Sequence, residues 1–170
     1  PIPLDKLIIG LNGALPASLR VSRAEEAEEG FHPCFSSRGK HYRYLFRFVK
    51  TRSPFLERFF WQIEDKLDVV KMQSAAKVFI GEHDFAAFAK SPQKYESTVR
   101  NILETSVTLE GELIVFDVIG TGFMHNMVRN MAQALYLVGK NEMDESEINE
   151  LYRNHNRRRL GAPAPPGGLY

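Results

Sequence analysis

Residues 98–119 read TVRNILETSVTLEGELIVFDVI, and this stretch decides the fold class. Two apolar-rich segments, residues 98–109 and 113–119, flank Glu110, Gly111 and Glu112. Glycine supplies the positive φ that a tight turn between antiparallel strands requires. The stretch therefore predicts a β-hairpin made of two long strands.

A further strand is predicted over residues 40–49, KHYRYLFRFV, because cationic and aromatic side chains alternate there. Alternation with a period of two is typical of a half-buried strand. One face would carry His41, Arg43, Leu45 and Arg47, and the other Tyr42, Tyr44, Phe46 and Phe48. A short strand is also expected over residues 19–24.

Helical periodicity occurs in four segments, and each has a start or stop signal. The segments are residues 4–15, 67–80, 123–138 and 144–153. Pro16 follows the first segment, and Gly81 and Gly139 follow the second and the third. Asp144 and Glu147 form a capping box at the start of the fourth. Long antiparallel strands combined with separate helices favour an α+β fold over a doubly wound sheet.

Length and composition indicate a globular chain of one domain, or of two small lobes that share a core. The chain has 170 residues, of which 44% are hydrophobic and 25% charged. No apolar run approaches the roughly 18 residues of a membrane span. The only cysteine, Cys34, allows no internal disulfide, and we expect a partly buried free thiol. A cytoplasmic location is predicted, or a nuclear or organellar one in a eukaryote.

Charge is nearly balanced in sum but segregated along the chain. The net charge is +1, yet residues 38–58 contain seven basic residues and one acid, Glu57. A second basic cluster covers residues 153–159, and acids gather in residues 25–29 and 142–150. Such segregation suits a polyanion, while the alternative is an ordinary solvated surface. Cations interleaved with aromatic rings in residues 38–48 suit RNA, because cations bind phosphates and rings stack on bases. The alternative is a strand whose aromatic side is core.

The sequence gives little support for a metal site or a nucleotide-binding site. His32 and Cys34 are two potential ligands where a metal site needs three or four, so no metal is expected. Gly120-Thr121-Gly122 lacks the rest of a nucleotide-binding motif. Arg129 is a lone cation in a mostly apolar helical segment, and such a cation usually has a carboxylate partner. The alternative is an arginine on the helix surface.

Five segments, in order, resemble motifs of the TruA-type tRNA pseudouridine synthases. The two most specific are the FH…YRY block and the GxGF…MVRN helix start. The five are NGALP at 12–16, FHPCFSSRGKHYRY at 31–44, GEHDF at 81–85 followed by Phe88, GTGFMHNMVRN at 120–130, and APA at 162–164 through GLY at 168–170.

The resemblance implies a mixed, mostly antiparallel sheet flanked by helices, with RNA in a basic cleft. It implies isomerisation of uridine to pseudouridine in the anticodon stem-loop of tRNA, at tRNA positions 38–40, without metal or organic cofactor. The target base must leave its stack before a protein can reach its glycosidic bond. In the family an aspartate acts as nucleophile. The resemblance also implies a homodimer with tRNA across both subunits.

Roles carry over onto matching positions. Tyr42 corresponds to the tyrosine that stacks on the target base or moves a proton. Arg129 corresponds to the arginine that pairs with the nucleophilic aspartate, and Leu169 to an apolar residue of the pocket. The predicted substrate-binding residues further include Arg38, Lys40, Arg43 and His125. For Tyr42 and Leu169 the alternative is plain core packing.

One family motif, G-R-T-D-x-G-V-H with the catalytic aspartate, does not occur in this sequence. We therefore expect residues 1–170 to be one catalytic-type domain, the larger C-terminal part of a pseudouridine synthase, inactive alone. Two alternatives are a non-catalytic RNA-binding relative and an α+β interaction domain without an RNA role. The second alternative predicts no salt-dependent affinity for tRNA.

Overall fold

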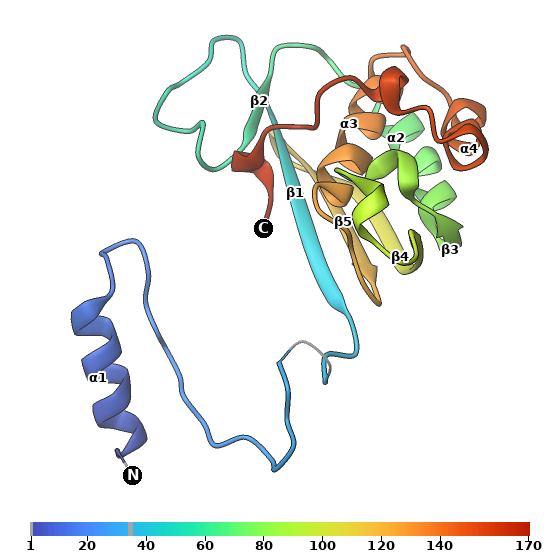
Figure 1. Cartoon of the computed structure of the whole chain (residues 1–170). Helices are drawn as coiled ribbons and strands as arrows, with labels where there is room; N and C mark the ends of the chain where they lie inside the picture. The colour runs from blue at the N-terminus through green and yellow to red at the C-terminus, as the bar shows by residue number, and fades with distance from the viewer. Residues whose placement is uncertain (1, 34–35) are drawn as a thin grey trace. The chain divides into compact units, whose positions relative to one another are not determined.

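The computed structural model describes residues 2–33 and 36–170 (Figure 1). The expectation for Cys34 lies outside the described residues. The chain divides into two compact units, Pro1–Ser37 and Arg38–Tyr170, which we call unit one and unit two. The assignment of all 170 residues to one catalytic-type domain stays a prediction.

Unit one contains the helix α1, Leu4–Ala14, which confirms the helix expected over residues 4–15. The strand expected over residues 19–24 is wrong, because this segment forms no strand. The Asn12 side chain instead binds the backbone of Val21 twice, donating to its carbonyl over 2.9 Å and accepting from its N–H over 2.8 Å. These are the two backbone groups that a neighbouring strand would otherwise pair with.

Unit two is built on a five-stranded sheet with the order β2-β1-β5-β4-β3. Only β1 and β2 pair in parallel, so the predicted mixed, mostly antiparallel sheet is confirmed. The predicted hairpin is β4 with β5, and Gly111 adopts a φ of 63° in its turn. The short strands β2 and β3 had not been predicted. The strands are β1 Lys40–Phe48, β2 Trp61–Ile63, β3 Gly81–Asp84, β4 Val99–Glu110 and β5 Leu113–Gly120.

Helices α2 and α3 cover the sheet face that carries the aromatic side chains of β1. Tyr44 and Phe46 are fully buried there with Phe116 of β5, in one core with Met72 of α2 and Met131 of α3. The predicted α+β class is therefore confirmed. The helices are α2 Val69–Ala76, α3 Met127–Gly139 and α4 Glu145–Asn154. Short 3-10 turns occur at 77–79, 86–88, 92–94, 157–160 and 166–168.

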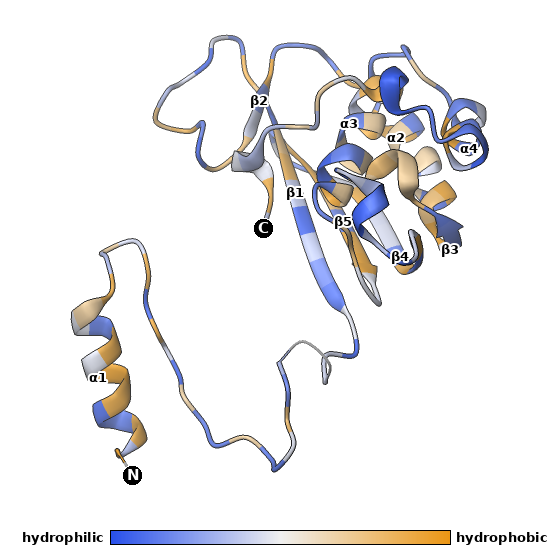
Figure 2. Cartoon of the chain, in the orientation of Figure 1, coloured by the Kyte–Doolittle hydropathy of each residue, from blue (hydrophilic) through white to orange (hydrophobic). Residues whose placement is uncertain are grey.

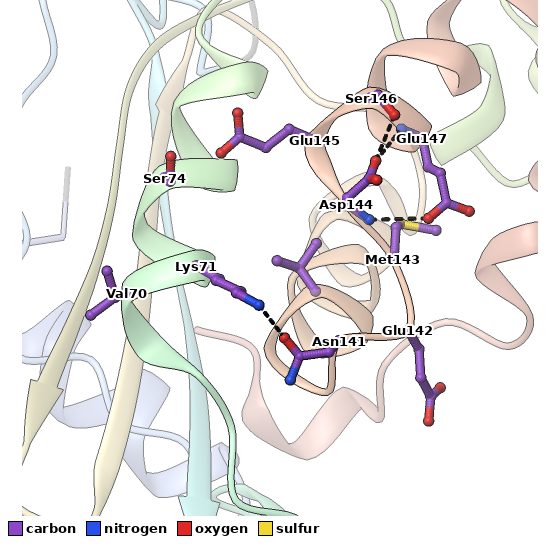
Figure 3. A pocket seen from close by; sticks show the side chains of 11 residues that line it. Val70, Lys71, Ser74, Asn141, Glu142, Met143, Asp144, Glu145, Ser146 and Glu147 are labelled. Carbon is purple, nitrogen blue, oxygen red and sulfur yellow. Dashed lines mark hydrogen bonds between the residues drawn. The ribbon is translucent and has the colours of Figure 1, made fainter.

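The ends of the helices follow their caps. In α4 the predicted capping box is confirmed: the Asp144 carboxylate accepts from the Glu147 N–H over 3.0 Å, and the Glu147 side chain accepts from the Asp144 N–H over 3.1 Å (Figure 3). Helix α2 is shorter than predicted, because Asp68 caps its start by accepting from the Lys71 N–H over 3.1 Å. It passes into a 3-10 turn at Lys77, before Gly81.

Helix α3 begins at Met127, four residues later than predicted. Asn126 adopts a left-handed backbone with a φ of 63°, which a continuing helix excludes. The segment 121–126 is therefore a loop. This loop lies beside the start of β1, and its residues Phe123, Met124, His125 and Asn126 line a cavity there.

Candidate active site

A cavity of about 360 Å³ opens in unit two between β1, the loop before α3, the first turn of α3 and the C-terminal segment. It brings together four of the predicted site residues, Tyr42, His125, Arg129 and Leu169, from three distant parts of the sequence. The lining consists of Tyr42, Phe123, Met124, His125, Asn126, Met127, Val128, Arg129, Pro166 and Leu169.

Tyr42 enters the cavity from β1, on the same face of the strand as the core residues Tyr44 and Phe46. Its ring meets the edge of Phe123 in a T-shaped contact, with centroids 5.1 Å apart and an interplanar angle of 81°. Unlike Tyr44, Tyr42 is only half-buried. A half-buried ring beside an apolar wall can offer a stacking surface for a flat base.

Arg129 lies in the first turn of α3 and is half-buried. Its Nε donates to the Ala164 carbonyl over 2.6 Å, and its Nη1 donates to the Asn126 side-chain oxygen over 3.1 Å. Both acceptors are neutral, and none of the described residues that line the cavity is an aspartate or glutamate. The site therefore holds a positive charge that no lining side chain neutralises. Such a charge favours the ionised form of a carboxylate placed beside it.

The C-terminal segment forms the remaining wall and is held by backbone contacts to β1. Tyr170 exchanges two backbone hydrogen bonds with Arg43, of 2.9 and 2.8 Å. The buried Tyr44 hydroxyl donates to the Pro165 carbonyl over 2.6 Å. Burial raises the pKa of Tyr44, while the nearby charge of Arg129 acts in the opposite direction. The phenol thus stays protonated and keeps donating at neutral pH.

The cationic residues at the start of β1 divide between the two faces of the sheet. Arg38 and Lys40 are exposed, and Lys40 shares the face of Tyr42. Figure 2 shows hydrophilic residues dominating the first half of β1. Arg43 lies on the opposite face and does not line the cavity, so its role in substrate binding stays a prediction.

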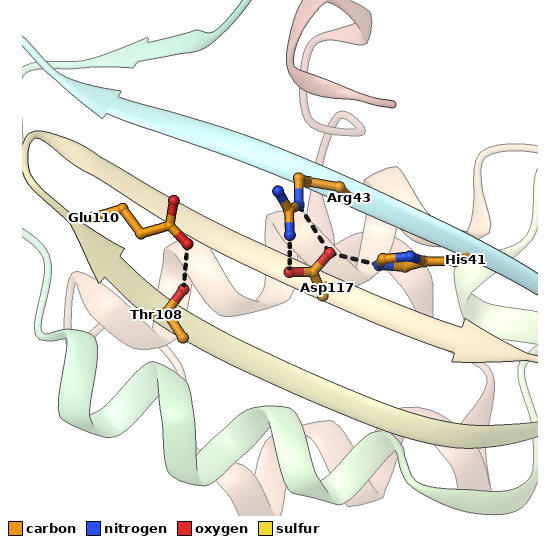
Figure 4. A network of polar contacts seen from close by, with 5 residues as sticks. All are labelled: His41, Arg43, Thr108, Glu110 and Asp117. Atoms are coloured by element: carbon orange, nitrogen blue, oxygen red, sulfur yellow. Dashed lines mark hydrogen bonds and ion pairs between the residues drawn. The ribbon is translucent and has the colours of Figure 1, made fainter.

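On that opposite face, Arg43 and His41 both bind Asp117 of β5 (Figure 4). Arg43 makes a bidentate pair through Nε and Nη2, at 2.9 and 3.0 Å, and His41 Nε2 lies 2.6 Å from the carboxylate. Partial burial alone would raise the pKa of Asp117, but the hydrogen bonds from Arg43 and His41 lower it below its ordinary value. The cluster ties β1 to β5 beneath the cavity.

Sequence reasoning missed two groups that shape the site, the Asn126 side chain and the Ala164 carbonyl. The one sequence signal for a special role of Asn126 was its residue type, because asparagine tolerates a left-handed backbone. The contact to Ala164 joins residues distant in sequence, so no local pattern predicts it. The backbone of His125 is also held by a residue distant in sequence, because its backbone N–H donates to the Tyr95 hydroxyl over 2.9 Å.

A larger cavity, of about 680 Å³, lies between α2 and the start of α4 (Figure 3). Four acidic residues line this cavity, and Lys71 is the only lysine or arginine among the described residues of the lining, so the net negative charge of the cavity disfavours a polyanion. The acidic residues are Glu142, Asp144, Glu145 and Glu147. Within the described residues, 2–33 and 36–170, no three histidine, cysteine, aspartate or glutamate side chains are grouped as metal ligands. None of the described helices has the length and apolarity needed to cross a bilayer.

Known proteins match this chain over nearly its whole length. A family model described as tRNA pseudouridine synthase matches residues 75–170. The tRNA pseudouridine synthase A of Pelobacter propionicus is 40% identical over 168 residues, which cover 99% of this chain and 69% of that protein. The enzymes of the same name from Thermoanaerobacter sp. and Myxococcus xanthus are 33% and 39% identical over 169 residues, covering 99% of this chain and 69% and 64% of those proteins.

The matched residues 75–170 include the loop before α3, Arg129 and the C-terminal wall of the cavity. The longer matches add β1 with Tyr42. Fold, cavity and similarity thus agree: the chain belongs to the tRNA pseudouridine synthases, of the TruA type.

Proposed function

We propose that the cavity around Tyr42 and Arg129 is where a uridine of tRNA is isomerised to pseudouridine, with the anticodon stem-loop uridines at tRNA positions 38–40 as targets. The observation that carries this proposal is the meeting of Tyr42, Arg129 and Leu169 in one cavity. Plain core packing would bury Tyr42 like Tyr44, whereas Tyr42 lines an open hollow beside an uncompensated cation.

Each group has a role in this reaction. The extruded uracil stacks on the ring of Tyr42 and contacts the apolar wall of Phe123 and Leu169, and the Tyr42 hydroxyl moves a proton in the isomerisation. Arg129 pairs with a carboxylate that acts as nucleophile, orienting it and keeping it ionised. The bond from ribose C1′ to N1 breaks and a bond from C1′ to C5 forms, while C5 loses its proton and N1 gains one. No organic cofactor or metal is required by this balance.

The nucleophilic carboxylate is the part of the site that this sequence does not supply. Among the described residues that line the cavity none is acidic, and Asp117, on the strand paired with β1, is bound to Arg43. We therefore propose that residues of the same gene product outside these 170 provide the aspartate, and that the chain is inactive alone.

RNA binding would use the exposed cations Arg38 and Lys40 beside the cavity, with His125 at its rim and Arg43 as a further contact. A homodimer with tRNA across both subunits, located in the cytoplasm, completes the proposal. Sedimentation velocity of the complete protein with and without tRNA tests the subunit count.

Release of tritium from tRNA labelled at C5 of uridine tests the function. The complete protein should release tritium, and transcripts carrying cytidine at positions 38–40 should release none above background. The 170-residue chain should release none from either substrate. An absence of release from the complete protein with unmodified target uridines contradicts the proposal.

A non-catalytic RNA-binding relative is the second candidate, favoured by the lack of a carboxylate in the cavity. It predicts that the complete protein binds tRNA with salt-dependent affinity but releases no tritium. The same two assays therefore separate the candidates.

A further inference from the structure

The orientation of the Arg129 guanidinium is fixed by two contacts that come from different parts of the fold. A guanidinium has five N–H donors. The Ala164 carbonyl takes the Nε–H, and Asn126 takes one hydrogen of Nη1. Three N–H groups remain, one on Nη1 and two on Nη2. Within the described part of the chain Nη2 has no hydrogen-bond acceptor, so it is the nitrogen with both hydrogens left for a partner in the cavity.

Ala164 is fully buried, and both its backbone carbonyl and its backbone N–H bind Arg129. Its carbonyl accepts from Nε over 2.6 Å, and its N–H donates to the Arg129 carbonyl over 3.3 Å. The main chain and the side chain of Arg129 are thus bound by the same residue. The contact to Ala164 holds the guanidinium at Nε. It does not hold Nη1 or Nη2, so a second contact is needed to fix the orientation of the group.

Asn126 supplies that second contact and gives up its usual role to do so. An asparagine directly before a helix normally accepts a hydrogen bond from a backbone N–H of the first turn. Asn126 occupies this position but makes no such bond, and its side-chain oxygen binds Nη1 of Arg129 over 3.1 Å. Its left-handed backbone, with φ 63° and ψ 4°, accompanies this contact.

We propose that Asn126 is a positioning residue, which holds Nη1 of Arg129 so that Nη2 faces the reacting carboxylate. The proposal rests on the proposed function, since it assumes that a carboxylate acts in this cavity. A long arginine side chain fixed before the reaction needs no reordering during it, and such preorganisation raises the rate of the chemical step more than the affinity for substrate.

The activity test uses Asn126→Gly in the complete protein. Glycine adopts a positive φ freely, so the backbone is preserved and only the side-chain oxygen is lost. The matched control is Asn141→Gly. Asn141 also has a left-handed backbone, with φ 61°, and also accepts from a cation, Lys71, but it lies at the other cavity.

We expect Asn126→Gly to lower kcat by about 10- to 100-fold, the effect of losing one hydrogen bond to a charged group. KM for tRNA should change by less than about twofold, and Asn141→Gly should retain wild-type kcat. In an Arg129→Ala background, Asn126→Gly should change kcat by less than about twofold, because Asn126 acts through Arg129. Wild-type kcat in Asn126→Gly, or the full loss in the Arg129→Ala background, overturns the proposal.

A second measurement does not depend on catalysis. Nuclear magnetic resonance exchange measurements on the Arg129 Nη1 and Nη2 groups report rotation about the Cζ–Nε bond. The rotation should become faster in Asn126→Gly and stay unchanged in Asn141→Gly. If the wild-type protein releases no tritium, the proposed function fails, while a rotation rate unchanged by Asn126→Gly overturns the positioning role by itself.

Discussion

Tyr42 differs from its neighbour Tyr44 in what its hydroxyl can do. Tyr44 is fully buried and its hydroxyl is bound to Pro165, whereas Tyr42 is half-buried at the cavity. The two residues share one face of β1, so alternation alone could not separate a core residue from a site residue. The loop before α3 makes the difference, because it leaves the hollow in front of Tyr42 only.

Tyr42→Phe in the complete protein should lower the kcat of tritium release by at least about 100-fold, the usual effect of losing a group that moves a proton. Affinity for tRNA should hold within about threefold, because the ring remains. Tyr136→Phe is the matched control, since the Tyr136 hydroxyl donates to Asp65 away from the cavity. Equal rates for the two variants would show that the Tyr42 hydroxyl takes no part.

Gly168 allows the C-terminal segment to lie against β1. A Cβ at this position would stand 2.7 Å from the Leu45 carbonyl oxygen and 2.9 Å from the Tyr44 ring. Gly168→Ala should therefore lower the free energy of unfolding by about 1–3 kcal/mol, measured by urea denaturation. Gly10→Ala, in α1 with open space around its Cβ, should not destabilise the protein. An unchanged midpoint for Gly168→Ala would contradict the close packing.

At the level of elements, the hairpin, β1, the α4 capping box and helix α1 follow from local sequence. Their signals are short-range: a turn glycine, alternation, a cap and a periodic stripe. The short strands β2 and β3 escaped prediction because three or four residues carry too little pattern. The predicted start of α3 was wrong, because the apolar periodicity of residues 123–138 extends into a loop whose conformation depends on Asn126. That loop lines part of the cavity, so site residues could be named from the sequence while the geometry of the site could not be predicted.

Asp117 gives β1 and β5 a pH-dependent link. Its pKa is lowered in the folded protein, so the ionised form contributes stability. This contribution is complete above the ordinary aspartate pKa of about 3.9 and is lost as the pH falls through the lower folded value. Asp117→Asn should therefore lose about 1 kcal/mol at pH 7 and show a shallower decline in stability below pH 4. Urea titrations at pH 7, 4 and 3 measure both, and parallel declines for the two proteins would refute the link.

At the scale of the whole molecule, the site lies entirely in unit two, while charge is segregated along the full chain. If cations beside the cavity bind the tRNA backbone, the complete protein should lose affinity steeply with salt. Four phosphate contacts predict a fall of about 100-fold between 50 and 200 mM salt. Filter binding at several salt concentrations measures the slope, and a flat dependence favours an interaction domain without an RNA role.

Arg129 is the residue on which the proposed uridine isomerisation in this cavity depends. The most direct measurement compares tritium release by Arg129→Ala and Arg47→Ala in the complete protein. Arg47 lies on β1, pairs with Glu112 and does not line the cavity. We expect Arg129→Ala to lose at least about 100-fold in kcat, as happens when a charged partner of the reacting group is removed, while Arg47→Ala stays within about threefold of wild type. Wild-type release by Arg129→Ala would show that Arg129 takes no part in the reaction.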